Sequence, residues 1–169
     1  MDRLYCKIVF GTWYLPQDDI AAAIAAGEYT KTYYLDDCTV GRVDLYSQPE
    51  GLCKVSYKEV PPPYEALVAE HHRKYPGAMC EFWTPAVLSD AGLWVVRTCL
   101  YDPAGAIDLQ FEIHSDEAGR WQREIKLGPG GEPVEERRPL FDCKGEQVGF
   151  GLYDSVGQLR TEYFNDDWA

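Results

Sequence analysis

Apolar and polar residues alternate along much of the second half of this 169-residue chain. In residues 106–113 (AIDLQFEI), every second position from Ile107 to Ile113 is apolar, and polar residues stand between them. A period of two predicts a β-strand with one apolar face. The same alternation recurs in three later segments, which are residues 121–127, 147–153 and 158–164. The pattern predicts strands, and no helix, from residue 93 onward.

A glycine marks each predicted turn between these strands, at nearly constant intervals. The five glycines are Gly105, Gly119, Gly131, Gly145 and Gly157, which lie 14, 12, 14 and 12 residues apart. Four of them follow an aspartate by three residues, and these aspartates are Asp102, Asp116, Asp142 and Asp154. Such an aspartate can accept a backbone hydrogen bond, and the glycine can adopt positive φ. The spacing predicts repeated hairpins with a period of about 26 residues.

The first half of the chain mixes strand patterns with two short helical patterns. Strands are predicted at RLYCKIVF, EYTKTYYL, GRVDLYSQ and GLCKVSYKE, and helices at about 17–27 and 63–75. The predicted fold class is therefore mainly β (α+β). It is an antiparallel β-meander of repeated hairpins that forms a curved sheet, with two short helices. We predict one domain over 1–169, with strands and both helices in 1–92 and regular hairpins in 93–169.

The charge balance is strongly acidic, with 16 basic and 28 acidic residues and a net charge of −12. Negative charge repels nucleic acid and anionic membranes, and it favours a basic protein partner. Solubility alone is an equally good reason for such a charge. No segment approaches the roughly 20 apolar residues of a membrane span, and the first residues do not read as a signal peptide. These features predict a cytoplasmic protein that binds neither nucleic acid nor membrane.

Patterns typical of catalysis or metal binding are weak in this sequence. The six cysteines form no C-x-x-C pair, and no glycine-rich phosphate loop precedes a helix. His71 and His72 are neighbours on a predicted helix, point about 100° apart, and are therefore not expected to share a metal. We predict no catalytic residue, no metal and no cofactor. A thiol–imidazole pair such as Cys99 with His114 stays open as an enzymatic alternative.

The repeated phrases YDPAG-AI and YDSVG-QL lie within residues 100–164, and they suggest relatives. They resemble the tyrosine–aspartate hairpin repeats of Rhs-type proteins and of antitoxin-like bacterial proteins. The order of a strand, Leu-Pro, an alanine-rich helix and YYLDDCTVGRV resembles small bacterial single-domain families. Several such acidic proteins look like immunity proteins for toxins delivered between bacteria. This chain is too short to form the toxin-enclosing shell of the longer Rhs proteins.

The resemblance implies a monomeric immunity protein that occludes the active site of a cognate toxin. We expect a basic toxin, or one with a basic cleft, that acts on nucleic acid or nucleotides. The predicted partner-binding residues are Asp102, Asp116, Glu117, Asp154, Asp166, Asp167 and Trp168. Each of these could instead be a solvated turn residue. A non-catalytic β-repeat scaffold or interaction module is the alternative function.

Overall fold

A computed structural model describes residues 7–11, 29–35, 37–47 and 51–164. The helix predicted at about 17–27 and the candidate residues Asp166, Asp167 and Trp168 lie outside this part of the chain. The described residues form one helix and a twelve-stranded sheet, so the mainly β class is confirmed. The helix predicted at 63–75 is confirmed as α2 (Glu65–Lys74).

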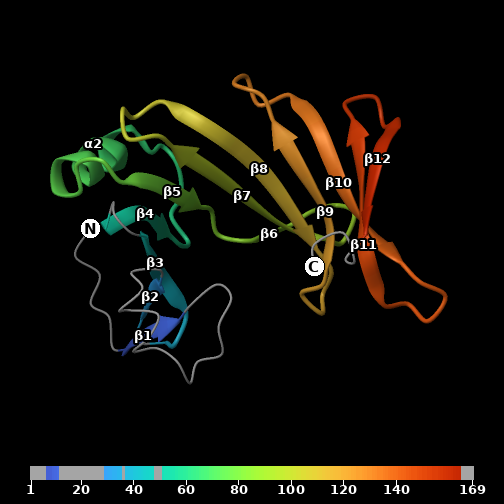
Figure 1. Cartoon of the computed structure of the whole chain (residues 1–169), viewed down its shortest axis with the longest axis horizontal. Coiled ribbons are helices and arrows are strands. Elements are labelled where there is room, and N and C mark those ends of the chain that lie inside the picture. The colour runs from blue at the N-terminus through green and yellow to red at the C-terminus, as the bar shows by residue number, and fades with distance from the viewer. Residues whose placement is uncertain (1–6, 12–28, 36, 48–50, 165–169) are drawn as a thin grey trace. The chain divides into compact units, whose positions relative to one another are not determined.

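The sheet follows the order of the chain (Figure 1). Its strands are β1 (Lys7–Gly11), β2 (Tyr29–Tyr34), β3 (Val40–Ser47), β4 (Gly51–Tyr57), β5 (Met79–Trp83), β6 (Val87–Leu88), β7 (Trp94–Tyr101), β8 (Ile107–Ser115), β9 (Trp121–Leu127), β10 (Pro133–Phe141), β11 (Gln147–Asp154) and β12 (Leu159–Phe164). Successive strands are hydrogen-bonded neighbours, except that β6 pairs only with β7 and β5 is therefore followed by β7. The chain divides into two compact units, residues 1–85 with 100–108 and residues 86–99 with 109–169. The prediction of a single domain stays a prediction.

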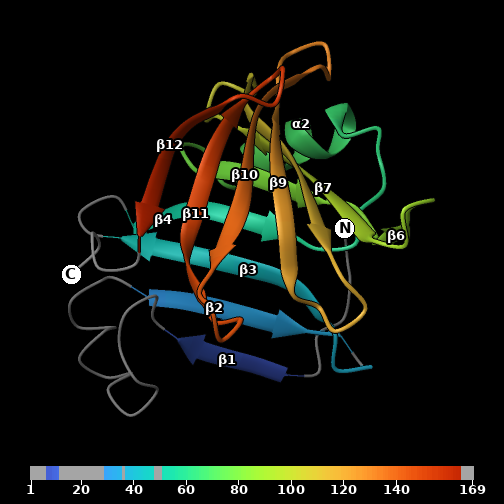
Figure 2. The same cartoon turned by 90° about the vertical axis from the view of Figure 1, so that its right-hand side faces the viewer.

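The first unit contains one departure from the predicted antiparallel sheet. Strands β1 to β4 lie side by side and antiparallel (Figure 2), but β4 and β5 are parallel. Helix α2 connects β4 to β5 and returns the chain to the end of the sheet where β4 began. A strand that follows such a crossover runs parallel to its neighbour. The prediction of a wholly antiparallel sheet is therefore wrong at this pair.

The core of the first unit lies between this parallel pair and α2. Val55 and Tyr57 on β4 alternate inward, and Cys80 and Phe82 do so on β5. Val68 and His71 are three residues apart on α2, so both face these strands and are buried. The Tyr64 and Phe82 rings stack with centroids 4.8 Å apart. Alternation on the strands and helical spacing on α2 together build this core.

The second unit is a succession of hairpins. Each described pair from β8 to β12 joins consecutive strands in antiparallel register. All five turn glycines have positive φ, between 76° and 85°. At Asp102, Asp116, Gly128, Asp142 and Asp154 the turns share one backbone pattern, in which the N–H of the first residue donates to the carbonyl four residues on. The turn glycine donates back to the first residue's carbonyl, as in a tight turn closed by a bulge. The predicted conformation of these glycines is confirmed.

Replacement of Gly105 by alanine is expected to lower the free energy of unfolding by about 1 kcal/mol. Gly105 has φ +85°, and an added Cβ would only touch His72 and Val68 at 3.5–3.6 Å. Gly119 has φ +76° with nothing within 4 Å, so Gly119→Ala should cost the same. Asparagine tolerates positive φ better than alanine, so Gly105→Asn should cost less. Urea denaturation checks this, and equal losses for Ala and Asn at Gly105 would contradict it.

The described residues contain no helix with the length and apolar character needed to cross a membrane.

Candidate functional site

The aspartates predicted to contact a partner are engaged in their own turns. Asp102 Oδ1 accepts the backbone N–H groups of Ala104 and Ala106, both at 2.9 Å. Asp154 Oδ1 accepts the corresponding N–H groups of Val156 and Gln158, at 3.1 and 2.9 Å. These bonds lower the pKa of Asp154, so its carboxylate stays ionised within the turn. These carboxylates therefore stabilise the hairpin turns. Their contact with a partner stays a prediction.

These acidic residues do not gather into one cluster in the second unit. Asp116 accepts the backbone N–H and the side chain of Arg120, and the adjacent Glu117 is exposed. Asp154 belongs to the third turn further along the chain, between β11 and β12. Successive turns of an antiparallel meander lie at opposite ends of its strands, so turns three steps apart also do. Asp116 and Glu117 therefore lie at one end of the meander and Asp154 at the other.

A buried ion pair organises the first unit. Arg42 and Asp44 are two residues apart on β3, so both side chains lie on the same face. Arg42 Nε donates to Asp44 Oδ1 at 2.5 Å and Nη2 donates to Oδ2 at 2.8 Å. Asp44 is only 1% exposed. Burial favours a neutral Arg42, but the hydrogen bond and charge of Asp44 outweigh it and raise the Arg42 pKa.

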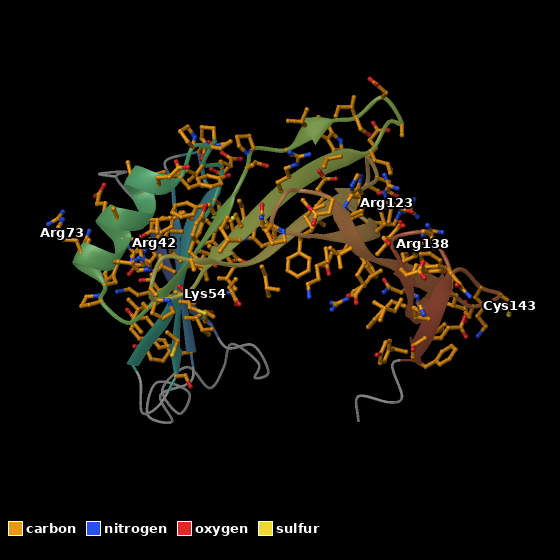
Figure 3. The ribbon with its side chains drawn as sticks, turned by 90° about the horizontal axis from the view of Figure 1, so that it is seen from above. Arg42, Lys54, Arg73, Arg123, Arg138 and Cys143 are labelled. Atoms are coloured by element: carbon orange, nitrogen blue, oxygen red, sulfur yellow. The ribbon has the colours of Figure 1, made fainter. Side chains whose placement is uncertain are left out.

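Tyrosine side chains surround this ion pair. Tyr33 donates its hydroxyl to Asp44 Oδ2 at 3.1 Å, and Arg42 Nη1 donates to the Tyr75 hydroxyl at 2.8 Å. The Arg42 guanidinium lies 5.1 Å from the Tyr33 ring centroid and 4.9 Å from that of Tyr75. Burial and the Asp44 charge raise the pKa of Tyr33 to about 12. The network therefore holds one charge pair beside a neutral Tyr33. Figure 3 shows Arg42 near α2.

His71 joins helix α2 to strand β4 and to Ala78, the residue that precedes β5. Burial lowers the pKa of His71, so its ring is neutral near pH 7. Its Nε2 lies 3.1 Å from the Ala78 carbonyl oxygen, which can only accept, so Nε2 carries the proton. Its Nδ1 then accepts the Tyr57 hydroxyl at 3.0 Å. The hydrogen bonds therefore fix the tautomer and the orientation of the ring.

Three metal-ligating side chains meet beside this histidine. One ligand atom each from His71, His72 and Cys80 lies within 4.8 Å of the other two. His72 Nε2 is buried and has no hydrogen-bond partner among the described residues. The expectation that His71 and His72 point too far apart to share a site is therefore wrong. Their rings lie only 5.1 Å apart, at 78° to each other, and both reach toward β5.

The other face of the parallel pair carries a polar cluster. Ser56 donates its hydroxyl to Glu81 Oε2 at 2.6 Å, and Lys54 Nζ lies 3.5 Å from the same oxygen. Burial opposes ionisation of Glu81, yet Lys54 and Ser56 lower its pKa overall, so it is a weak base. Burial lowers the pKa of Lys58 to about 8, and its Nζ lies 3.1 Å from the Trp83 ring centroid.

A row of charged side chains crosses one face of the second unit. On β7 and β8, the Arg97 guanidinium is paired with Glu112, with Nε at 2.7 Å from Oε1. On β10, Arg138 donates to both carboxylate oxygens of Glu136, at 2.8 and 2.9 Å. Arg123 on β9 lies 3.9 Å from Glu136 and beside Arg138 (Figure 3). The glutamates are largely covered, whereas the guanidinium groups reach solvent.

His114 is the buried member of this charged row. Its side chain is 7% exposed, and its Nε2 lies 3.4 Å from Glu112 Oε2. Its Nδ1 is buried and has no hydrogen-bond partner among the described residues, so the Cys99–His114 pair is not hydrogen-bonded through this atom. Burial and the neighbouring Arg123 lower its pKa, although Glu112 and Glu136 oppose that shift. His114 is therefore neutral near pH 7.

Acidification from about pH 7.5 to about pH 5.5 is expected to destabilise the fold through His114. The folded state holds His114 with a pKa below that of the unfolded chain, near 6.5. The unfolded chain therefore takes up the proton first, and stability falls as pH falls through this window. His71 acts in the same direction.

Urea denaturation at both pH values measures this loss of stability. His114→Gln should lose less stability than the native chain over the interval. Identical losses for the two proteins would contradict the account.

Strand β12 is an open element of the second unit. It is the last strand in the sheet order, and all six of its residues are exposed. Leu159, Tyr163 and Phe164 are 45%, 37% and 44% exposed. Phe150 on β11 stacks on Tyr163, with centroids 4.9 Å apart. This strand therefore combines a sheet edge with exposed apolar and aromatic side chains.

Sequence reasoning missed the residues that now stand out. The spacing of Arg42 and Asp44 in GRVDLY indicates a shared strand face, but it does not distinguish a buried face from a solvated one. The proximity of Cys80 to the two histidines depends on how α2 packs on β5, so no local pattern signals it. For β12, the alternation in QLRTEYF was correctly interpreted as a strand, but not as an edge.

Comparison with protein-family models, with curated proteins and with solved structures found no match to this chain.

Proposed function

We propose that this chain is an immunity-type protein that binds a secreted bacterial toxin and blocks its active site. The observation that carries the proposal is strand β12, which stands last in the sheet order and whose six residues are all exposed. The resemblance of its hairpin phrases to antitoxin-like proteins supports the same role. The chain acts as a monomer, and the toxin is basic or has a basic cleft for nucleic acid or nucleotides.

The backbone of β12 supplies the first kind of contact. An edge strand presents N–H and C=O groups that another strand can pair with. Proteins often bind an extended segment by adding it to such an edge, and side-chain pockets then give specificity. A segment of the toxin near its active site pairs with β12 in this way. Among the described residues β12 pairs with β11, and we assign its other side to the partner.

The side chains of β12 supply the second kind of contact. Tyr163 lies on one face of the hairpin, opposite Phe150 in the register, and Phe164 lies on the other face opposite Gly149. Aromatic residues of this kind are enriched at the centres of protein interfaces. The stacking of Phe150 on Tyr163 orients the Tyr163 ring before the partner arrives. The hairpin therefore offers aromatic contacts on both of its faces.

The acidic balance supplies long-range attraction. A net charge of −12 accelerates encounter with a basic cleft and repels nucleic acid. Glu162 is exposed on β12, and Asp166, Asp167 and Trp168 follow it in the sequence. We assign partner contacts to these residues. The turn aspartates Asp102, Asp116 and Asp154 serve mainly to hold the hairpins.

The proposal includes the finer architecture of the second half. We take residues 93–169 to be a hairpin array with a period of about 26 residues, curved as a sheet within a single domain. In such an array the last hairpin has a neighbour on one side only. This position explains why binding is assigned to β11 and β12 rather than to an inner hairpin.

Co-purification with a secreted effector encoded beside this chain tests the proposal. The native chain should bind that effector, and calorimetry should give its dissociation constant. A triple variant of β12 (Leu159→Ser, Tyr163→Ser, Phe164→Ser) should weaken binding by at least about 100-fold. The loss follows from removal of exposed side chains, so circular dichroism should show an unchanged fold.

A second triple variant is the matched control. Val87, Val134 and Phe141 are also exposed apolar residues of the second unit, at 64%, 47% and 52%, but none lies on β12. Their replacement by serine should leave the dissociation constant within about threefold of the native value. Equal losses from both triples would overturn the assignment to β12. Failure of the native chain to bind the effector would favour a general scaffold instead.

A further inference from the structure

We propose that His71, His72 and Cys80 form a binding site for a soft transition-metal ion, with Zn²⁺ as the leading candidate. The three side chains come from α2 and from β5, and their ligand atoms lie within 4.8 Å of one another. Imidazole nitrogen and thiolate sulfur are both ligand types that bind zinc, and some zinc sites use only three protein ligands. This site lies in the first unit and is independent of the proposed toxin contact on β12.

His71 is already oriented as a metal ligand. A metal-bound histidine usually donates its other ring N–H to a carbonyl or carboxylate, which fixes the tautomer. His71 Nε2 donates to the Ala78 carbonyl oxygen at 3.1 Å in this way. Its Nδ1 holds a lone pair that now accepts the Tyr57 hydroxyl at 3.0 Å. Metal binding replaces that one neutral hydrogen bond, whose net contribution to stability is small.

His72 supplies the second nitrogen. Its Nε2 is buried and has no hydrogen-bond partner among the described residues. A buried polar atom without a partner is destabilising, and an ion is one explanation for it. The turn at Gly105 lies against the other side of the ring, because a Cβ there would be 3.5 Å from Nδ1. We assign Nε2 to the metal, which removes the cost of leaving this nitrogen unsatisfied.

Cys80 supplies the sulfur from the middle of the core. It is 0% exposed, on the face of β5 that packs against α2. On binding, its thiol proton passes to solvent and the thiolate forms the bond to the metal. The cluster contains sulfur and nitrogen donors and no carboxylate. Such donors select Zn²⁺ or Cu⁺ over Mg²⁺ and Ca²⁺.

Metal binding requires the three ligand atoms to move slightly closer together. Zinc bonds of about 2.1 Å to nitrogen and about 2.3 Å to sulfur place tetrahedral ligand atoms about 3.4–3.6 Å apart. In the structure the three ligand atoms lie within 4.8 Å of one another. Side-chain rotations that move these atoms by about an ångström would bring them to the spacing that zinc requires. The three ligands leave a fourth position open beside the Tyr57 hydroxyl. A bound ion would thus tie helix α2 to strand β5 and stabilise the crossover.

Titration of the full-length chain with Co²⁺, a spectroscopic substitute for Zn²⁺, tests the site. The native chain should bind one equivalent, with a thiolate-to-cobalt charge-transfer band and the visible bands of tetrahedral cobalt. Zn²⁺ should abolish both sets of bands by displacement, and it should raise the midpoint of thermal unfolding. Cys80→Ser should eliminate the charge-transfer band, and His72→Gln should weaken Co²⁺ binding at least about tenfold.

Two controls separate this site from other thiols and imidazoles. Cys99→Ser removes another buried thiol, and His114→Gln removes a histidine outside the cluster; both should bind Co²⁺ as the native chain does. His72 is only partly buried, so His72→Gln remains informative if Cys80→Ser fails to fold. A native chain without a thiolate–cobalt band would overturn the proposal. Bands that persist unchanged in Cys80→Ser or in His72→Gln would also overturn it.

Discussion

Replacement of Asp44 by alanine should lower the free energy of unfolding by about 3–5 kcal/mol. Asp44 is 1% exposed, and its two oxygens accept both the Nε and the Nη2 of Arg42. Without the carboxylate, the Arg42 charge stays largely buried, and among the described residues only the Tyr75 hydroxyl remains as its acceptor. The loss is a large fraction of the 5–15 kcal/mol that holds a typical domain together. Urea denaturation measures it directly.

Two further variants isolate the physical cause. The double variant Arg42→Met, Asp44→Leu removes both charges, so most of the lost stability should return. Asp37→Ala removes an exposed aspartate that bonds only to Thr39, and it should change stability far less. If the double variant were as unstable as Asp44→Ala, the uncompensated Arg42 charge would not be the cause of the loss.

Replacement of Gly149 by alanine should cost at least about 3 kcal/mol and release β12 from the sheet. A Cβ at this position would lie closer than any contact distance to the Tyr163 carbonyl oxygen, and 2.9 Å from the Phe164 Cα. Both are backbone atoms, so the whole strand must move to accommodate the methyl group. Hydrogen exchange should show fast exchange of the β12 amides, with slow exchange retained in the first unit.

Gly151→Ala is the matched control two residues away on the same face of β11. There an added Cβ meets side chains, the Tyr153 ring at 3.0 Å and the Leu159 methyl at 3.2 Å. Side chains can rotate, so the expected cost is only about 1 kcal/mol. Protection of the β12 amides should survive. Equal loss of protection in both variants would show that the close backbone approach at Gly149 is not what matters.

The two glycines also clarify the GFG sequence of β11. Glycine-rich segments can form phosphate-binding loops, but such a loop precedes a helix, and these two glycines lie within strand β11. In the structure, Gly149 lets β12 approach closely, and Gly151 makes room for Tyr153 and Leu159. The glycines are therefore requirements of strand packing, and of the β11–β12 hairpin to which partner binding is assigned.

The strands and turns could be predicted because they depend mainly on residues close together in the sequence. Alternation identified the strand from Ile107 to Ser115, and the aspartate–glycine spacing identified turns whose glycines have positive φ. The parallel pairing of β4 and β5 was missed because pairing direction depends on how the chain crosses α2. The strand–helix–strand order of residues 51–83 carried that signal, since such a crossover usually joins parallel strands.

The candidate sites were harder to predict because they arise from contacts between distant segments. Adjacency of His71 and His72 argued against a shared metal, and nothing in the sequence placed Cys80 between them. The turn acids were predicted as partner contacts because they are exposed in a hairpin. In Asp102 and Asp154 the carboxylates instead accept backbone N–H groups. The aspartate–glycine spacing that predicted each turn therefore also predicted that the aspartate accepts hydrogen bonds from the backbone of that turn.

Growth of bacteria that produce the effector encoded beside this chain tests the central claim most directly. Co-production of the native chain should restore growth, as should the control with serine at Val87, Val134 and Phe141. The variant with serine at Leu159, Tyr163 and Phe164 should be present at the same level in the cells and should fail to protect them. Full protection by this β12 variant, or no protection by the native chain, would contradict the account.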